Sequence, residues 1–235
     1  MATVGIIGGI GPESTIDYYR LLIAGYREHK KDDTYPHIII NSVNLQELRD
    51  LLTEKKLDRV ADILVEEVNR LERAGAQFGF FAANSAHVVF EEVQQRVSIP
   101  LVSISEATCE EVKKKGMKKL ALLGTRFTME APFYHNLFAK EGITLVLPNP
   151  KEIDYIHQKY IGELLNNIFL PETREGILGV VDRMAKDDGI EGIILGGTEL
   201  PLIIGKDMTS HNDLPFFDTT QIHARAVVSR MLGGL

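Results

Sequence analysis

The strongest constraint on the fold of this 235-residue chain is the alternation of short, continuous apolar runs with longer amphipathic stretches. Apolar runs without polar alternation are typical of parallel strands that are covered by helices on both faces. The runs are Val4–Ile7, His37–Val43, Phe78–Ala82, Leu101–Ile104, Leu120–Leu123, Thr144–Leu147 and Gly192–Leu195. This alternation predicts an α/β protein with mainly parallel sheets.

The stretches between these runs carry the apolar period of helices, with three to four residues per turn. Residues 57–74 are the clearest case, and Gly75 is expected to end this helix. A second helix is predicted over residues 153–169, and Pro171 is expected to end it.

Parts of the sequence repeat weakly, which predicts two lobes of similar plan. Val4–Gly8 resembles Leu120–Gly124, and Phe80–Ser85 resembles Ile194–Glu199. We therefore predict two pseudo-symmetric lobes, each with a mainly parallel sheet flanked by helices. The predicted lobes are an N-terminal one of residues 1–98, to which about 210–235 return, and a C-terminal one of residues 99–209.

Composition excludes several classes of protein. The 33 Asp and Glu residues against 26 Lys and Arg residues give a formal charge of −7, whereas a nucleic-acid binder needs a basic surface. No apolar run approaches the ~18 residues of a membrane helix, and the first residues lack the basic region of a signal peptide. The single cysteine rules out an intramolecular disulfide and fits a reducing compartment. We expect a cytoplasmic protein with no nucleic-acid or membrane partner.

Small and hydroxyl residues follow the predicted strands, where open α/β sheets bind their ligands. Backbone N–H groups of such residues, and helix N-termini, can approach an anion closely. The segments concerned are 8–14, 41–44, 83–87, 124–128 and 197–199. A small carboxylate or phosphate between two lobes is the expected ligand.

No motif for a cofactor or a metal ion stands out. Gly9-Ile10-Gly11 follows a strand, but the third glycine of a dinucleotide fingerprint is absent, and the next strand has no acidic residue for a ribose. Pro12 instead suits the first position of a helix. The seven histidines lack the spacing of metal ligands. We expect no cofactor and no metal.

Three single residues have competing interpretations. His87, just beyond a strand end, is either a general acid or base or a packed histidine, and both interpretations stay open. His223 is interpreted as structural, in a helix that Asp218 or Thr219 caps. Cys109 lies within a helical pattern and is expected to be a small buried apolar residue.

The strand-end motifs together resemble the cofactor-independent aspartate/glutamate racemase family over nearly the whole chain. The motifs are Gly8–Thr15, Ala83–His87, Leu123–Met129, Gly196–Leu200 and Asp218–His223. The resemblance implies two α/β lobes, a homodimer, and a small acidic amino acid or dicarboxylate in the cleft between the lobes. It also implies an isomerase of amino-acid metabolism that works without pyridoxal phosphate.

The chain departs from the family at the two positions that carry its chemistry. The family mechanism uses one cysteine from each lobe, which the resemblance places at Ala83 and Gly197 of this chain. One thiolate removes the α-proton and the opposite thiol returns a proton to the other face. Because both thiols are absent, the two-thiol mechanism cannot run here.

The surrounding positions still match the family pattern. Candidate acid–base residues are Glu199, His87 and Glu13. The implied ligand contacts are Gly9, Asn44, Asn84, Ser85, Thr125, Arg126, Lys159 and Thr198.

Three functions remain open from the sequence. The favoured one is an isomerase, racemase or lyase of the family that uses other acid–base groups. The second is a non-catalytic binding protein for an acidic metabolite, and the third is an aspartate racemase with both cysteines replaced. Glu199 and His87 facing one another across the cleft, with perturbed protonation, would favour an enzyme, whereas loop hydrogen bonds that hold both away from the ligand space would favour a binding protein.

Overall fold

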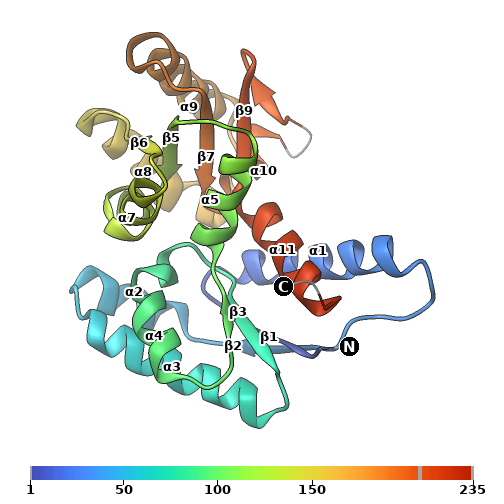
Figure 1. Cartoon of the computed structure of the whole chain (residues 1–235). Coiled ribbons are helices and arrows are strands. Elements are labelled where there is room, and N and C mark those ends of the chain that lie inside the picture. Colours follow the sequence, from blue (N-terminus) through green and yellow to red (C-terminus); the bar gives the residue numbers. More distant parts are fainter. Residues whose placement is uncertain (1, 206–207, 234–235) are drawn as a thin grey trace. The chain divides into compact units, whose positions relative to one another are not determined.

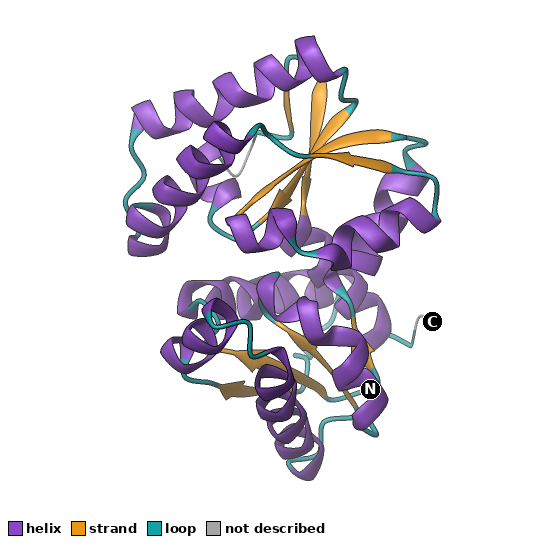
Figure 2. Cartoon of the chain, turned by 90° about the vertical axis from the view of Figure 1, so that its left-hand side faces the viewer, coloured by secondary structure: helices purple, strands orange, loops and turns teal. Residues whose placement is uncertain are grey.

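A computed structural model of the chain describes residues 2–205 and 208–233. The chain divides into two compact α/β units, Met1–Ala107 with Gln221–Leu235 (unit 1) and Thr108–Thr220 (unit 2). Figure 1 shows that each unit has its own sheet, and Figure 2 shows helices on both faces of each sheet. No described helix is long and apolar enough to span a membrane.

Unit 1 contains a four-stranded parallel sheet of order β2-β1-β3-β4. Its strands are β1 (Val4–Gly8), β2 (Ile38–Ser42), β3 (Phe78–Phe81) and β4 (Leu101–Val102). Its helices are α1 (Pro12–Lys30), α2 (Leu45–Thr53), α3 (Leu57–Arg73), the 3-10 helix η1 (Ser85–Val89) and α4 (Phe90–Arg96). Two further helices, α5 (Ile104–Lys114) and α11 (Thr219–Met231), include residues of both units.

The two faces of the unit 1 sheet are buried under different helices, as continuous apolar strands require. Ile7 and Phe81 lie in one cluster with side chains of α2, α3 and α4. Ile6 and Phe80 lie in a second cluster with side chains of α1 and α11. The predicted α3 is confirmed, and the Gly75 N–H donates to the Glu72 carbonyl at its end.

Unit 2 repeats this plan with the order β6-β5-β7-β9-β8, in which only β8 is antiparallel. Its strands are β5 (Lys119–Gly124), β6 (Thr144–Val146), β7 (Gly192–Gly196), β8 (Ser210–His211) and β9 (Leu214–Asp218). Its helices are α6 (Arg126–Glu130), α7 (Pro132–Lys140), α8 (Pro150–Gly162), η2 (Leu164–Asn166), α9 (Pro171–Arg183), the π-helix η3 (Met184–Asp188) and α10 (Leu200–Ile204). Since β5 pairs with β6 and β7 as β1 pairs with β2 and β3, the two predicted pseudo-symmetric lobes are confirmed.

The boundaries of the units differ from the predicted positions near residues 98 and 209. Strand β4 pairs with β3, which keeps residues 101 and 102 in the first sheet. Strand β9 pairs with β7, which keeps residues 214–218 in the second sheet. The first segment of unit 1 therefore ends at residue 107 instead of 98, and unit 2 ends at residue 220 instead of 209.

The helix predicted over residues 153–169 is wrong at both ends. A capping box of Asn149 and Glu152 starts α8 earlier, at Pro150. The helix ends at Gly162, and Asn167 takes a left-handed backbone conformation after η2. Pro171 occupies the first turn of α9, where a missing N–H costs nothing.

Candidate functional site

Tight backbone packing joins the end of β1 to α1 and to the end of β2 in unit 1. A Cβ atom added to Gly9, whose φ is +80°, would lie 2.5 Å from the Val43 carbonyl oxygen. A Cβ atom added to Gly8 would lie 2.5 Å from Thr15 Cγ2, and Thr15 Oγ1 accepts a 2.9 Å hydrogen bond from Gly9 N. Packing alone therefore explains these two glycines.

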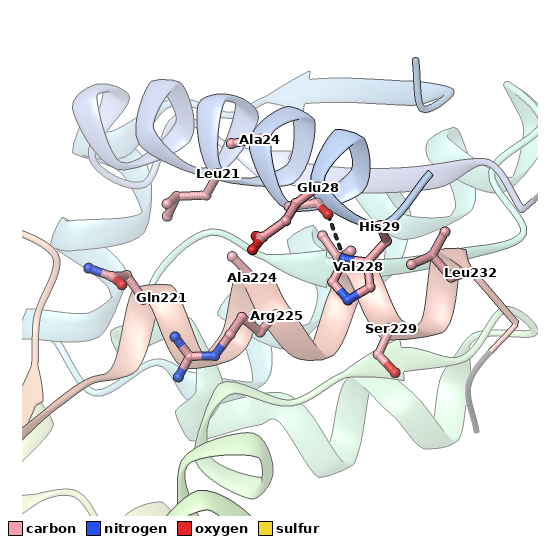
Figure 3. Close-up of a pocket in the computed structure, with 11 residues that line it drawn as sticks. Leu21, Ala24, Glu28, His29, Gln221, Ala224, Arg225, Val228, Ser229 and Leu232 are labelled. Atoms are coloured by element: carbon pink, nitrogen blue, oxygen red, sulfur yellow. Dashed lines mark hydrogen bonds between the residues drawn. The ribbon is translucent and has the colours of Figure 1, made fainter. Parts of the chain in front are cut away.

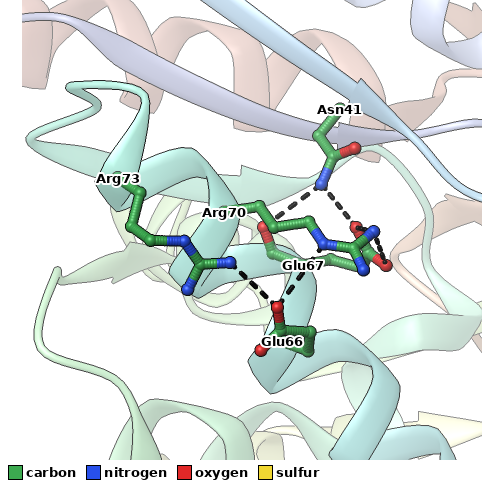
Figure 4. A network of polar contacts seen from close by, with 5 residues as sticks. All are labelled: Asn41, Glu66, Glu67, Arg70 and Arg73. Atoms are coloured by element: carbon green, nitrogen blue, oxygen red, sulfur yellow. Dashed lines mark hydrogen bonds and ion pairs between the residues drawn. The ribbon is translucent and has the colours of Figure 1, made fainter.

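Polar side chains at the end of β2 hold neighbouring helices. Asn41 Nδ2 donates to the Glu67 backbone carbonyl at 3.2 Å and to Glu67 Oε2 at 2.6 Å, while Arg70 lies 2.9 Å from Glu67 Oε1 (Figure 4). Asn44 Oδ1 accepts from Gln46 N at 3.1 Å and caps α2. The predicted ligand residue Asn44 therefore has a structural partner in the described chain.

His87 is packed into unit 1 with both ring nitrogens hydrogen-bonded. Nδ1 lies 2.9 Å from the Ala83 carbonyl, and Nε2 accepts from Ile104 N at 3.0 Å. The side chain is 2% exposed and stacks on Phe90 with a centroid distance of 5.2 Å. Burial lowers the pKa of His87 to about 3, and nearby His223 adds to this effect. His87 is therefore neutral at pH 7 and holds two loops together.

The remaining predicted residues of unit 1 differ in exposure. Ala83 and Asn84 are buried directly after β3, and Ser85 is half-buried at the start of η1. Glu13 is exposed in the first turn of α1, where the helix dipole favours a carboxylate. These positions place one amide, one hydroxyl and one carboxylate near the strand ends.

Two predicted cations of unit 2 are paired with carboxylates of the same unit. Arg126 contacts Asp154 and lies 3.5 Å from Glu130. Lys159 pairs with Glu163, which lies four residues later, just past the end of α8. Thr125 Oγ1 accepts from Thr128 N at 3.2 Å and caps α6. Any ligand anion at these residues must compete with the existing partners.

Glu199 lies in a buried polar cluster directly beyond β7. Its Oε2 atom accepts hydrogen bonds from the Tyr160 hydroxyl and from Thr198 Oγ1, the latter at 2.8 Å. Glu199 is 6% exposed and Tyr160, on α8, is 3% exposed. No Lys, Arg or His of residues 2–205 and 208–233 lies within ion-pair distance of Glu199, and Oε1 has no hydrogen-bond partner there.

Tyr160 was not predicted as a site residue. Burial and the Glu199 carboxylate raise its pKa well above the usual value, so the phenol stays protonated and acts as a donor. The sequence places Tyr160 at the apolar period of its helix with Ile153 and Ile156, which indicates a core residue. Nothing in the sequence links it to Glu199, 39 residues away.

Cys109 has no role at the strand ends. It is 2% exposed. Burial, together with Glu141, raises the pKa of its thiol to about 11. The thiol is therefore protonated at pH 7 and is a poor nucleophile.

A groove in unit 1 lies between α1 and α11 (Figure 3). Its volume is about 510 Å³, and Leu21, Glu28, His29, Arg225 and Val228 contribute to its walls. Because no strand-end residue lines it, we do not assign the ligand to it. The described residues contain no group of three or more His, Cys, Asp or Glu side chains that could hold a metal ion.

Most of the chain matches one known protein family. A sequence model of the family described as Asp/Glu/Hydantoin racemase matches residues 7–227. The broad specificity amino-acid racemase RacX of Bacillus subtilis is 31% identical over 146 residues, which are 59% of this chain and 61% of RacX. The chain thus spans less than two thirds of this relative.

Solved structures match over nearly the full length. An aspartate racemase homologue from Pyrococcus horikoshii is 37% identical with a TM-score of 0.84, and 99% of this chain and 100% of the other are covered. A Yersinia pestis protein assigned as an Asp/Glu racemase is 32% identical with a TM-score of 0.89 and the same coverage.

Proposed function

The chain belongs to the Asp/Glu/hydantoin racemase family, and we propose that it binds a small acidic amino acid and exchanges its α-proton through a carboxylate instead of two thiols. Glu199 is the observation that carries this proposal. Two hydroxyl donors bind its Oε2 atom, so Oε1 is the atom left for a proton. A carboxylate that hydrogen bonds hold in place can act as an effective general base.

The proposed reaction uses one base. Inversion at the α-carbon requires bases on opposite faces, because a single base returns the proton to the face from which it came. Unit 1 has Ala83 at the position that corresponds to Gly197, and the nitrogens of its buried His87 are already bonded to backbone groups. We therefore propose proton exchange with retention of configuration.

The relatives and the uncharged donors at the strand ends support the proposed ligand class. RacX is named a broad specificity amino-acid racemase, and the Pyrococcus horikoshii protein is named an aspartate racemase homologue. We propose that Thr125 and Thr198, which follow the paired strands β5 and β7, bind a ligand carboxylate, since Arg126 and Lys159 are paired within unit 2. We also propose that the protein forms a homodimer, as the family resemblance implies.

Proton exchange in D₂O tests the proposed function. The protein is incubated with L- and D-aspartate and with L- and D-glutamate, and the Cα–H signal is followed by NMR. We expect the signal of one of these amino acids to disappear while its configuration is retained. Exchange with inversion would contradict the one-base proposal and would point to a second base such as Glu13.

A binding protein is the second candidate function, and the bonded nitrogens of His87 favour it. In that case the Cα–H signals keep their intensity, whereas ligand resonances broaden in a saturable way. This result would overturn the catalytic proposal and leave the acidic-ligand proposal in place.

A further inference from the structure

The space beside Gly197 is filled by the ring of Tyr160. A Cβ atom added to Gly197 would lie 2.8 Å from both Cε2 and Cζ of Tyr160, and closer still to its oxygen. Real Cβ atoms essentially never approach other atoms within 3.0 Å. A side chain at residue 197 and the tyrosine ring in its present place therefore exclude each other.

The backbone does not require glycine at residue 197. Gly197 is absent from the glycines with positive φ, so its backbone conformation is open to other residues. At the corresponding position of unit 1, Ala83 carries a Cβ atom. At residue 197 it is therefore the Tyr160 ring, and not the backbone conformation, that opposes a side chain.

The hydroxyl of Tyr160 also contacts Glu199. It donates to Oε2, and Thr198 Oγ1 donates to the same atom at 2.8 Å. Tyr160 and Glu199 are both buried, so the hydrogen bond between them is shielded from competing water. The second carboxylate oxygen is left without a partner among the residues that the structure describes.

We infer that Tyr160 is a positioning residue for Glu199. Residues 160 and 197 also form a coupled pair: the phenol of Tyr160 occupies the space that a side chain at residue 197 would fill, so the effect of a substitution at one residue depends on the other. The coupling rests on the geometry of unit 2 alone. The effect on Glu199 chemistry rests on the proposed function.

A double-mutant cycle tests the coupling. We expect Gly197→Ala to lower the folding equilibrium constant roughly 10- to 100-fold, because overpacking is destabilising. In a Tyr160→Ala background the same change should have almost no cost, since the ring is gone. Urea unfolding of the four proteins measures both steps, and an equal cost in both backgrounds would overturn the inference.

Gly179→Ala is the matched control for this cycle. Gly179 lies in α9, and a Cβ atom there would meet nothing within 4 Å. This substitution should not destabilise the protein, which separates a clash from a general effect of replacing glycine.

Tyr160→Phe tests the positioning role, because it keeps the ring and removes only the hydroxyl. We expect kcat for α-proton exchange to fall at least ~10-fold while KM and the urea midpoint change little. Tyr134→Phe removes another buried hydroxyl of unit 2 and should leave kcat and KM unchanged.

Unchanged kcat in Tyr160→Phe would overturn the positioning role. If the parent protein shows no exchange, the proposed function fails, and the folding cycle still decides the coupling.

Discussion

Replacing Glu199 by glutamine is expected to lower the rate of α-proton exchange by ~10²–10⁴-fold, the range typical for loss of a general base. The amide oxygen of glutamine can still accept hydrogen bonds from Tyr160 and Thr198. The side chain keeps its size but can no longer take up a proton. Initial rates of Cα–H loss in D₂O, measured together with thermal unfolding, separate lost chemistry from lost folding.

Glu191→Gln is the matched control for this prediction. Glu191 is a carboxylate of the same unit that lies just before β7, at the opposite end of this strand from Glu199, and its Oε2 atom accepts from Lys119 N at 3.2 Å. Its replacement should leave the exchange rate unchanged. A Glu199→Gln protein that exchanges as fast as its parent would show that the base lies elsewhere, with Glu13 as the next candidate.

Acid is expected to destabilise unit 1 because two buried histidines must stay neutral for it to fold. His87 donates from Nδ1 to the Ala83 carbonyl and accepts at Nε2 from Ile104 N. His223 donates from Nε2 to the Val102 carbonyl at 2.9 Å and accepts at Nδ1 from the Tyr18 hydroxyl at 2.8 Å. A proton added at Nε2 of His87 would place two donors against each other, and a proton added at Nδ1 of His223 would remove the acceptor of the Tyr18 hydroxyl.

The pKa shifts give the direction and the pH window of this effect. Burial lowers the pKa of His223 to about 4, and burial with the charge of His223 lowers that of His87 to about 3. Above the unfolded value near 6.5 both states are neutral, so the stabilisation is complete. As the pH falls from 6.5 toward 4, the unfolded chain binds protons that the folded chain cannot, and stability is lost.

We expect a loss on the order of 5 kcal/mol in unfolding free energy between pH 7 and pH 4, since each pKa unit corresponds to ~1.4 kcal/mol. Urea unfolding at several pH values measures it. A His223→Gln protein, which lacks one of the two groups, should lose clearly less stability over the same range. An equal pH dependence in parent and variant would contradict this account.

The architecture was predictable because buried parallel strands leave continuous apolar runs in the sequence. The weak repeat between Val4–Gly8 and Leu120–Gly124 placed these strands correctly at equivalent central positions of the two sheets. Strand β9 was missed because Pro215 argues against a central strand, although β9 lies between β7 and the two-residue β8.

The site was less predictable because its side-chain partners are distant in sequence. Glu199 was a candidate from the sequence, but Tyr160, its hydrogen-bond donor, is indistinguishable from a core residue of its helix. The pairing of Lys159 with Glu163 follows an i,i+4 spacing that is visible in the sequence. The contact of Arg126 with Asp154 depends on the tertiary fold.

The most direct test of the central claim is α-proton exchange by the Cys109→Ala protein, which contains no thiol. Cys109 is buried and protonated, so its removal should not touch the proposed chemistry. We predict that this thiol-free protein removes the Cα–H signal of an acidic amino acid in D₂O at the parental rate and with retained configuration. Loss of exchange in a folded Cys109→Ala protein would contradict the claim that Glu199, and not a thiol, moves the proton.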